Sequence, residues 1–329
     1  MSTLSTLSVR VARKALETAD ICTFELVGVD GGPLPAFSAG SHVDVALPHV
    51  PHGLTRQYSL CNDPKETHRY LIGVLRDPAS RGGSQAMHDG VQEGQVLQIS
   101  APKNHFPLAH DAQRSLLLAG GIGVTPILCM AERLAIMGAD FDMHYCTRSR
   151  ERTAFYGRIA SSSYVDKVQF HFDDGVPEQK LDIAATLAAP QNSPNSGVHL
   201  YVCGPKGFME AVLNTARLQG WPDHQLHYEF FAAEVVKLET DASFEVKLAS
   251  SGRVITVQKE QTVVQALWAE GVEVLTSCEQ GVCGTCLTRV LEGVPDHKDM
   301  YLTPEEQAAN DQFLPCCSRS KTPLLVLDL

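Results

Sequence analysis

Hydrophobic and polar residues alternate along the first third of the chain. Six short segments show this period of two, and turn residues such as Asn62, Asp63 and Gly94 separate them. The segments are 7–14, 21–28, 41–48, 56–62, 69–77 and 95–102. Alternation with little helical periodicity is typical of half-buried antiparallel strands. We therefore predict an antiparallel β-barrel over the first block, 1–109.

The period changes in the second block, residues 110–232. Apolar runs that end in glycine alternate there with segments of helical periodicity. One predicted helix has Thr125 as N-cap, Pro126 at its first position and Gly138 at its C-terminal end. A second helix is expected within 205–220. Strands that alternate with helices indicate an α/β domain with a parallel sheet.

The third block returns to strand character. Residues 243–257 predict two strands around a Ser-Gly turn. Thr262 and Gln265 form the capping box of a short helix, which Gly271 ends. A connection without periodic pattern precedes the block, around 232–242. We therefore expect a multidomain protein with domains at 1–109, 110–232 and 237–329.

Composition excludes several classes of protein. The 329 residues carry a formal net charge of −11, which does not suit a nucleic acid or an anionic membrane as main partner. No apolar run approaches the roughly 18 residues of a membrane span, and the N-terminal segment lacks a signal-peptide pattern. Ten cysteines without a secretion signal indicate reduced thiols. We expect a cytoplasmic protein.

The densest candidate chemistry lies in the stretch SCEQGVCGTC, residues 277–286. Its three cysteines are spaced C-x4-C-x2-C, and an adjacent pair follows: Cys278, Cys283, Cys286, Cys316 and Cys317. Four thiolates with this spacing are the ligand set of a plant-type [2Fe–2S] cluster. The alternatives are a zinc site, whose cysteines usually come as C-x2-C pairs, and free buried thiols. The spacing does not decide between the two members of the adjacent pair as fourth ligand.

Two glycines in the same stretch, Gly281 and Gly284, have a predicted purpose. Three ligands on one tight loop must surround a compact group, which leaves little room for side chains. Glycine permits positive φ and lets backbone N–H groups approach the cluster sulfides. We therefore expect positive φ at both positions.

Two segments of the first block suit a flavin. In TRQYSL, alternation places Arg56 and Tyr58 on one face of a strand, and Ser59 follows. A guanidinium can bind a phosphate bidentately, and a phenol ring can lie on an isoalloxazine. The loop SRGGS offers backbone N–H groups and a hydroxyl at Gly82, Gly83 and Ser84. Each segment alone is also compatible with an ordinary strand or turn, but together they predict a flavin site.

The second block has two candidate nucleotide turns. AGGIGVTP follows an apolar strand and opens a helix, whose N-terminal N–H groups favour a phosphate. Pro126 occupies the third glycine position counted from Gly121, so the G-x-G-x-x-G pattern is not met. YVCGP brings Cys203 to the same carboxyl edge, where open α/β sheets bind ligands. The alternative is a pair of ordinary strand–helix turns.

These motifs together resemble the phthalate dioxygenase reductase family. RQYSL, RGGS, GGIGVTP, YVCGP and SCEQGVCGTC occur in the order seen in that family and cover nearly the whole chain. The resemblance implies a flavin β-barrel, a parallel-sheet nucleotide domain and a C-terminal β-grasp ferredoxin domain. It implies FMN, NADH and a [2Fe–2S] cluster as cofactors. It also implies that electrons go to a Rieske-type non-heme iron oxygenase.

The resemblance also assigns roles to residues. FMN would be bound by Arg56, Ser59, Gly82, Gly83 and Ser84, with Tyr58 against the ring and Phe231 at the flavin edge. The nicotinamide would be bordered by Gly121, Thr125 and Cys203, the last near its reactive carbon. Arg148 and Ser149 would meet the adenosine side. The cluster ligands would be Cys278, Cys283, Cys286 and Cys316, with Cys317 as a packing residue.

The implied reaction takes a hydride from NADH to the flavin, which then passes single electrons through the cluster to the oxygenase. Asp173 and Asp174 are compatible with NADH because carboxylates would repel a 2′-phosphate, although they could equally be turn residues. One alternative is a reductase for another monooxygenase or acceptor. A second is a non-enzymatic electron carrier or zinc module. The sequence does not identify the oxygenase or its substrate, for which an aromatic acid is our first expectation.

Overall fold

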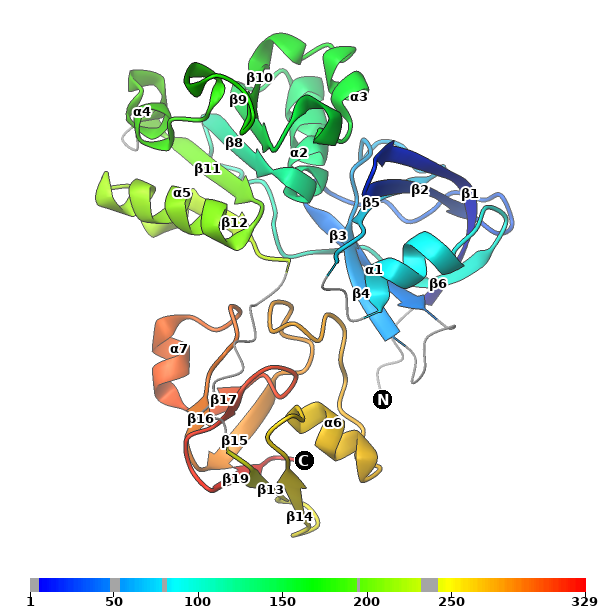
Figure 1. Ribbon diagram of the computed structural model, residues 1–329, viewed down its shortest axis with the longest axis vertical. Coiled ribbons are helices and arrows are strands. Elements are labelled where there is room, and N and C mark those ends of the chain that lie inside the picture. The colour runs from blue at the N-terminus through cyan, green and yellow to red at the C-terminus, as the bar shows by residue number, and fades with distance from the viewer. Residues whose placement is uncertain (1–5, 48–53, 79–81, 194–195, 232–241) are drawn as a thin grey trace. The chain divides into compact units, whose positions relative to one another are not determined.

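The computed structural model describes residues 6–47, 54–78, 82–193, 196–231 and 242–329. The chain divides into two compact units, Met1–Glu229 and Phe230–Leu329 (Figure 1). The predicted connection at 232–242 lies outside the described residues, apart from its last residue. No helix in the described ranges is long and apolar enough to cross a membrane.

The first unit begins with an antiparallel sheet, as the alternating pattern predicts. Its strands are β1 (Thr6–Thr18), β2 (Ile21–Gly28), β3 (Ser41–Leu47), β4 (Leu54–Ser59), β5 (Tyr70–Leu75), β6 (Val96–Ser100) and β7 (Lys103–Asn104). Their order is β4-β3-β6-β1-β2-β5, and β7 pairs with β3. A bridge between Leu60 and Ile72 joins the two ends of this order, so the sheet closes on itself. Fully buried side chains such as Phe24 and Val43 fill its interior.

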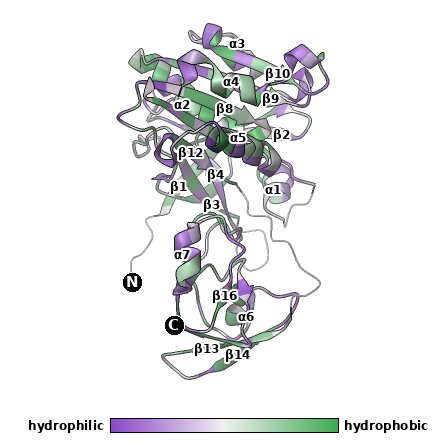
Figure 2. Cartoon of the chain, turned by 90° about the vertical axis from the view of Figure 1, so that its left-hand side faces the viewer, coloured by the Kyte–Doolittle hydropathy of each residue, from purple (hydrophilic) through white to green (hydrophobic). Residues whose placement is uncertain are grey.

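The second sheet of this unit is parallel throughout, as the strand–helix alternation predicts. Its strands are β8 (Arg114–Gly120), β9 (Phe141–Thr147), β10 (Val168–Phe172), β11 (Val198–Cys203) and β12 (Leu226–Glu229). The helices around it are α2 (Val124–Met137), α3 (Tyr156–Ala160), α4 (Ile183–Ala188) and α5 (Lys206–Leu218). In Figure 2 the buried strand β8 is hydrophobic, whereas α5 carries both hydrophilic and hydrophobic residues.

The order β10-β9-β8-β11-β12 fixes where a ligand can bind. The chain runs from β8 outward to β10 and then returns to β11 on the other side of β8. This reversal is the topological switch point of an open α/β sheet, and ligands bind outside the carboxyl ends of the strands there. The relevant edge is therefore formed by the ends of β8 and β11.

The beginning of α2 differs from the sequence prediction. Gly123 is the N-cap, and Thr125, predicted for that role, lies inside the helix. A 3-10 turn over Gly121–Gly123 starts the rotation early, because Gly121 takes a φ of +51°. The Thr125 hydroxyl instead donates to the Ile122 carbonyl at 3.0 Å. The predicted C-terminal end is confirmed, since Gly138 ends α2 with a φ of +66°.

The second unit is a mixed sheet with one helix packed on it, which is the expected β-grasp arrangement. Its strands are β13 (Phe244–Leu248), β14 (Val254–Val257), β15 (Thr288–Glu292), β16 (Pro295–Asp296), β17 (Gln312–Phe313), β18 (Arg319–Ser320) and β19 (Leu324–Leu327). The main sheet has the order β14-β13-β19-β15-β17, and β16 pairs with β18. The helices are α6 (Val263–Ala269) and α7 (Pro304–Ala309). The capping box predicted at Thr262 and Gln265 is present.

Candidate functional site

The predicted flavin residues come together at β4 and the short helix α1 (Gly83–Gln85). Arg56 and Ser59 are buried, and Tyr58 packs against the barrel interior. A Cβ at Gly83 would lie 2.7 Å from Arg56 Cγ, so a side chain there would displace the guanidinium. Gly82 has a φ of +95°, which favours glycine. The buried cation beside a bare backbone turn fits a phosphate group.

Ser84 is engaged within its own loop. Its hydroxyl accepts an N–H from Asp77 at 3.2 Å. The serine therefore anchors the start of α1, and its contact with a flavin phosphate stays a prediction.

The predicted nicotinamide residues lie at the switch point. A Cβ on Gly123 would clash with the carbonyl of Cys203, and a Cβ on Gly204 would lie 3.0 Å from Gly120 Cα. Glycines at these positions let the ends of β8 and β11 approach closely. Thr125 lies in the first turn of α2, and a Cβ on Gly73 of β5 would lie 2.9 Å from its Cγ2, so the barrel contacts this edge. The sheet thus brings Cys203 and Thr125 to one place.

Sequence reasoning missed Glu229, which belongs to the same edge. It ends β12 in register with Cys203, and its Oε2 accepts a hydrogen bond from the Ser59 hydroxyl at 3.4 Å. Its Oε1 lies 3.9 Å from His42 Nδ1. The side chain is 17% exposed. A charged residue at the end of a short strand, in HYEFF, was the available signal.

Burial decides the protonation of this group. Desolvation raises the pKa of Glu229 to about 8, and the hydrogen bond from Ser59 opposes that rise. The carboxyl is therefore mostly protonated at neutral pH. Burial, and then the proximity of Glu229, raise the pKa of the Cys203 thiol. The raised pKa values disfavour the charged forms of both groups at this edge.

The predicted adenosine residues lie further along the same edge. Arg148 is exposed directly after β9, and its carbonyl accepts the N–H of Asp174 at 3.1 Å. Asp173 and Asp174 are both exposed after β10. The Ser149 carbonyl accepts a hydrogen bond from the Thr153 hydroxyl at 2.9 Å, which fixes the turn. The acidic pair therefore lies beside Arg148.

The four predicted cluster ligands are buried in the second unit. Their exposed fractions are 4% for Cys278, 6% for Cys283, 3% for Cys286 and 3% for Cys316. They stand as two contacting pairs, Cys278 with Cys283 and Cys286 with Cys316. Within the described ranges, no three His, Cys, Asp or Glu side chains surround a single ion-sized site. Two pairs suit a two-iron cluster better than one tetrahedral zinc.

The loop of residues 277–286, here called the three-cysteine loop, has the backbone that such a group needs. Gly281 and Gly284 take φ values of +72° and +70°, which confirms the prediction. A Cβ on Gly284 would clash with the Tyr301 ring. The N–H of Gln280 lies 3.3 Å from Cys278 Sγ, as a donor to a thiolate does. The loop therefore fits a compact anionic cluster.

Cys317 occupies a different position from its neighbour. It contacts Cys316 and lies 3.7 Å from the Leu314 carbonyl oxygen. A Cβ on Gly281 would lie 2.5 Å from its sulfur. This packing role agrees with the assignment of Cys316 as fourth ligand, which stays a prediction.

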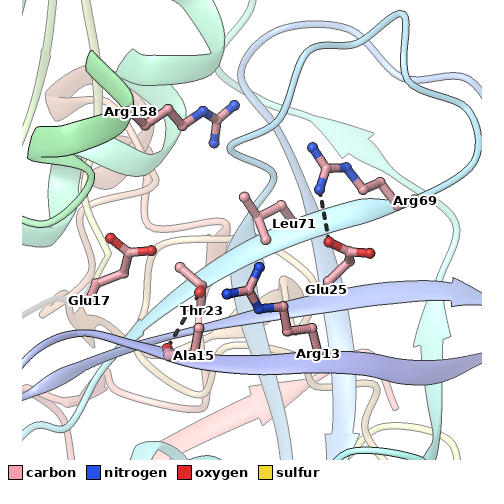
Figure 3. Close-up of a pocket in the computed structure, with 8 residues that line it drawn as sticks. All are labelled: Arg13, Ala15, Glu17, Thr23, Glu25, Arg69, Leu71 and Arg158. Atoms are coloured by element: carbon pink, nitrogen blue, oxygen red, sulfur yellow. Dashed lines mark hydrogen bonds and ion pairs between the residues drawn. The ribbon is translucent and has the colours of Figure 1, made fainter. Parts of the chain in front are cut away.

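A cavity of about 210 Å³ lies apart from both candidate sites, between the barrel and α3 (Figure 3). It is lined by Arg13, Ala15, Glu17, Thr23, Glu25, Arg69, Leu71 and Arg158. Arg69 pairs with Glu25 at 2.8 Å, and Arg158 pairs with Glu132 at 2.7 Å. None of the predicted flavin or nucleotide residues lines it.

Comparisons with known proteins decide the family. Residues 246–321 match the 2Fe-2S iron-sulfur cluster binding domain. The chain is 58% identical to a vanillate O-demethylase oxidoreductase of Pseudomonas putida, over 95% of this chain and 96% of that one. It is 38% identical to the phthalate dioxygenase reductase of Burkholderia cepacia, over 98% and 97% of the two chains. The chain belongs to the phthalate dioxygenase reductase family.

A solved structure supports the same conclusion. A phthalate dioxygenase reductase, described as modular and as transferring electrons from pyridine nucleotides to [2Fe-2S], superposes with a TM-score of 0.79. The alignment covers 99% of this chain and 98% of that one, at 38% identity. Membership of the phthalate dioxygenase reductase family confirms the predicted fold class and makes the chain an oxidoreductase with an iron–sulfur domain. It argues against the zinc-module alternative.

Proposed function

We propose that this protein is the NADH-dependent reductase component of a vanillate O-demethylase. It would pass electrons through FMN and a [2Fe–2S] cluster to a Rieske-type oxygenase in the cytoplasm. The observation that carries the proposal is the hydrogen bond between Ser59 and Glu229. It joins β4, which carries Arg56, to the end of β12, which is in register with Cys203, and both lie within one unit. Greater identity to the vanillate system than to the phthalate one, 58% against 38%, favours a methoxylated aromatic acid as the oxygenase's substrate.

Bound FMN would supply the conversion between two-electron and one-electron transfer. The protein's residues would bind and orient it. Arg56 and the turn at Gly82–Ser84 would hold its phosphate, and Tyr58 would lie on its ring. Glu229, neutral at pH 7, leaves an uncharged group between Ser59 and Cys203.

The remaining assignments concern the nucleotide and the flavin edge. Gly121 and Thr125 would border the nicotinamide, and Arg148 and Ser149 would hold the adenosine side. Phe231 is 37% exposed and lies in the second unit, so its role at the flavin edge is a proposal from family resemblance.

An anaerobic visible spectrum before and after one equivalent of NADH tests the proposed function. We expect flavin bands with cluster absorption to the red, and we expect both to bleach. Chromatography of the released flavin should give FMN. With a vanillate oxygenase added, NADH should then support demethylation of vanillate. Bleaching without demethylation would point to another oxygenase, and a colourless protein would contradict the proposal.

Arg56→Leu is expected to remove most of the bound flavin. The change deletes a buried cation that can bind a phosphate bidentately, and hydrogen bonds to charged groups contribute about 1.5–3 kcal/mol each, or roughly 10- to 150-fold in affinity. Flavin content per chain, measured by absorbance, checks this. Arg10→Leu, an exposed arginine on β1, is the matched control and should keep full flavin content.

Gly123→Ala is expected to weaken NADH-dependent ferricyanide reduction, on the order of tenfold in kcat/KM. The new Cβ would clash with the Cys203 carbonyl and push β11 away from the start of α2. Gly207→Ala on α5 is the control, since a Cβ there meets nothing within 4 Å. Equal activity of the two variants would show that the close approach does not shape the site.

A further inference from the structure

The three-cysteine loop rests against a buried acidic residue that is not a predicted ligand. Asp299 follows β16, and its side chain is fully buried. The N–H groups of Tyr301 and Leu302 donate to its Oδ2 at 3.3 and 2.9 Å. The Ser318 hydroxyl donates to its Oδ1 at 3.3 Å. Three hydrogen-bond donors therefore converge on the two oxygens of this side chain.

This residue connects the two segments that carry the cysteines. The N–H of Met300 donates to the Gly281 carbonyl at 2.9 Å, so the residue after Asp299 is bonded to the three-cysteine loop. A Cβ on Gly281 would lie 3.2 Å from Asp299 Cα. On the other side, Ser318 belongs to the turn that carries Cys316. The segment of Asp299 therefore contacts both elements: the Met300 N–H binds the loop of three ligands, and the Asp299 carboxylate binds the turn of the fourth through Ser318.

One titratable side chain of the described residues forms a close ion pair with Asp299. His297 Nδ1 lies 3.5 Å from its Oδ1, and this imidazole is only 6% exposed. Within the part of the chain that the structure describes, neither ring nitrogen of His297 has a hydrogen-bond partner. On the same segment, Lys298 Nζ is 3.8 Å from Asp296, whose side chain is 29% exposed. The negative charge of Asp299 therefore lies in a desolvated place, beside the loop and away from bulk water.

We propose that Asp299 is a positioning residue that clamps the three-cysteine loop to the Cys316 turn and sets the cluster's reduction potential below the value it would otherwise have. Reduction adds an electron to the cluster, and a nearby buried negative charge disfavours the reduced form. The hydrogen bonds fix the loop, and the charge acts through space. The inference rests on the iron–sulfur assignment of the domain and not on the proposed nucleotide or oxygenase.

Asp299→Asn tests the proposal in the full-length protein. Asparagine has nearly the same shape, and its Oδ1 can still accept the N–H groups of Tyr301 and Leu302. The cluster's midpoint potential is measured by titration with a chemical reductant, followed by visible and EPR spectra. We expect normal iron content and a shift to more positive potential. A tenfold shift in the reduction equilibrium corresponds to about 59 mV for one electron.

Asp296→Asn is the matched control, because it removes a more exposed carboxylate from the same segment. Its potential should equal that of the wild type. A fully loaded Asp299→Asn protein with an unchanged potential would overturn the proposal. A purely structural role would lower iron content without moving the potential of the clusters that remain.

Ser318→Ala covers the case in which Asp299→Asn does not retain iron. It removes one donor from the carboxylate and keeps the charge. The expected shift is therefore opposite in sign, to more negative potential. An unchanged potential in this variant would also overturn the proposal. Because the titration uses neither NADH nor an oxygenase, a failure here leaves the proposed function standing.

Discussion

Cys283→Ser is expected to separate two activities of this protein. NADH-dependent cytochrome c reduction, which needs the cluster, should fall on the order of 100-fold or more, while NADH-dependent ferricyanide reduction at the flavin should persist. Cys283 is buried and paired with Cys278, so its loss removes half of one predicted ligand pair. Iron analysis and the two assays on the same preparation check this.

Cys317→Ser is the control for that experiment. Its sulfur is buried and close to the site but packs against Gly281, so both activities should remain. If Cys317→Ser lost cytochrome c reduction and Cys316→Ser retained it, the fourth ligand would be Cys317 and not Cys316. Equal loss of both activities in folded Cys283→Ser protein would contradict the proposed electron order.

Glu229→Gln is expected to remove a pH dependence of flavin reduction by NADH. In the wild type, Glu229 loses its proton as the pH rises through about 8. The new charge would lie beside Cys203, at the edge where hydride transfer is proposed, and would oppose movement of negative charge. The rate should then fall by about tenfold, equivalent to about 1.4 kcal/mol. Glu229→Gln should be flat over the same range in stopped-flow traces.

The same ionisation predicts a change in stability, whose sign follows from the raised pKa. The folded state binds the Glu229 proton more tightly than the unfolded state, in which the pKa is about 4.5. Stability therefore falls as pH rises between about 4.5 and 8, and the glutamine variant lacks this fall. Thermal unfolding at several pH values measures the difference. Glu210→Gln, a half-exposed carboxyl on α5, should behave like the wild type.

Periodicity predicted most of the elements because half-buried strands and amphipathic helices have distinct periods. The segment 21–28 was predicted as a strand and is β2, and the helix between Thr262 and Gly271 has the capping box that its sequence shows. The prediction of Thr125 as the N-cap of α2 was wrong because the 3-10 turn at Gly121–Gly123 moves the start of the helix toward the N-terminus. A threonine near the start of a helix does not reveal such a turn.

Side-chain contacts between residues that are distant in the sequence could not be predicted from periodicity or motifs. Glu229 acquires its significance from Ser59, which is 170 residues away in sequence and belongs to another sheet. The proposed role of Asp299 likewise depends on Ser318 and on the three-cysteine loop, which are both distant from it in sequence. The cysteine spacing, by contrast, is local and was readable. Motifs contained in one segment can be found in a sequence, whereas the charges that tune them depend on the fold.

The strand order of the second unit has a consequence for biosynthesis. β19 follows all four predicted cluster cysteines in the chain, yet it lies at the centre of the sheet between β13 and β15. A nascent chain that has exposed the first three cysteines therefore lacks the strand around which the domain folds. Iron delivery should find an organised receptor only after β19 has left the ribosome, so maturation of the centre is expected to follow the synthesis of this strand.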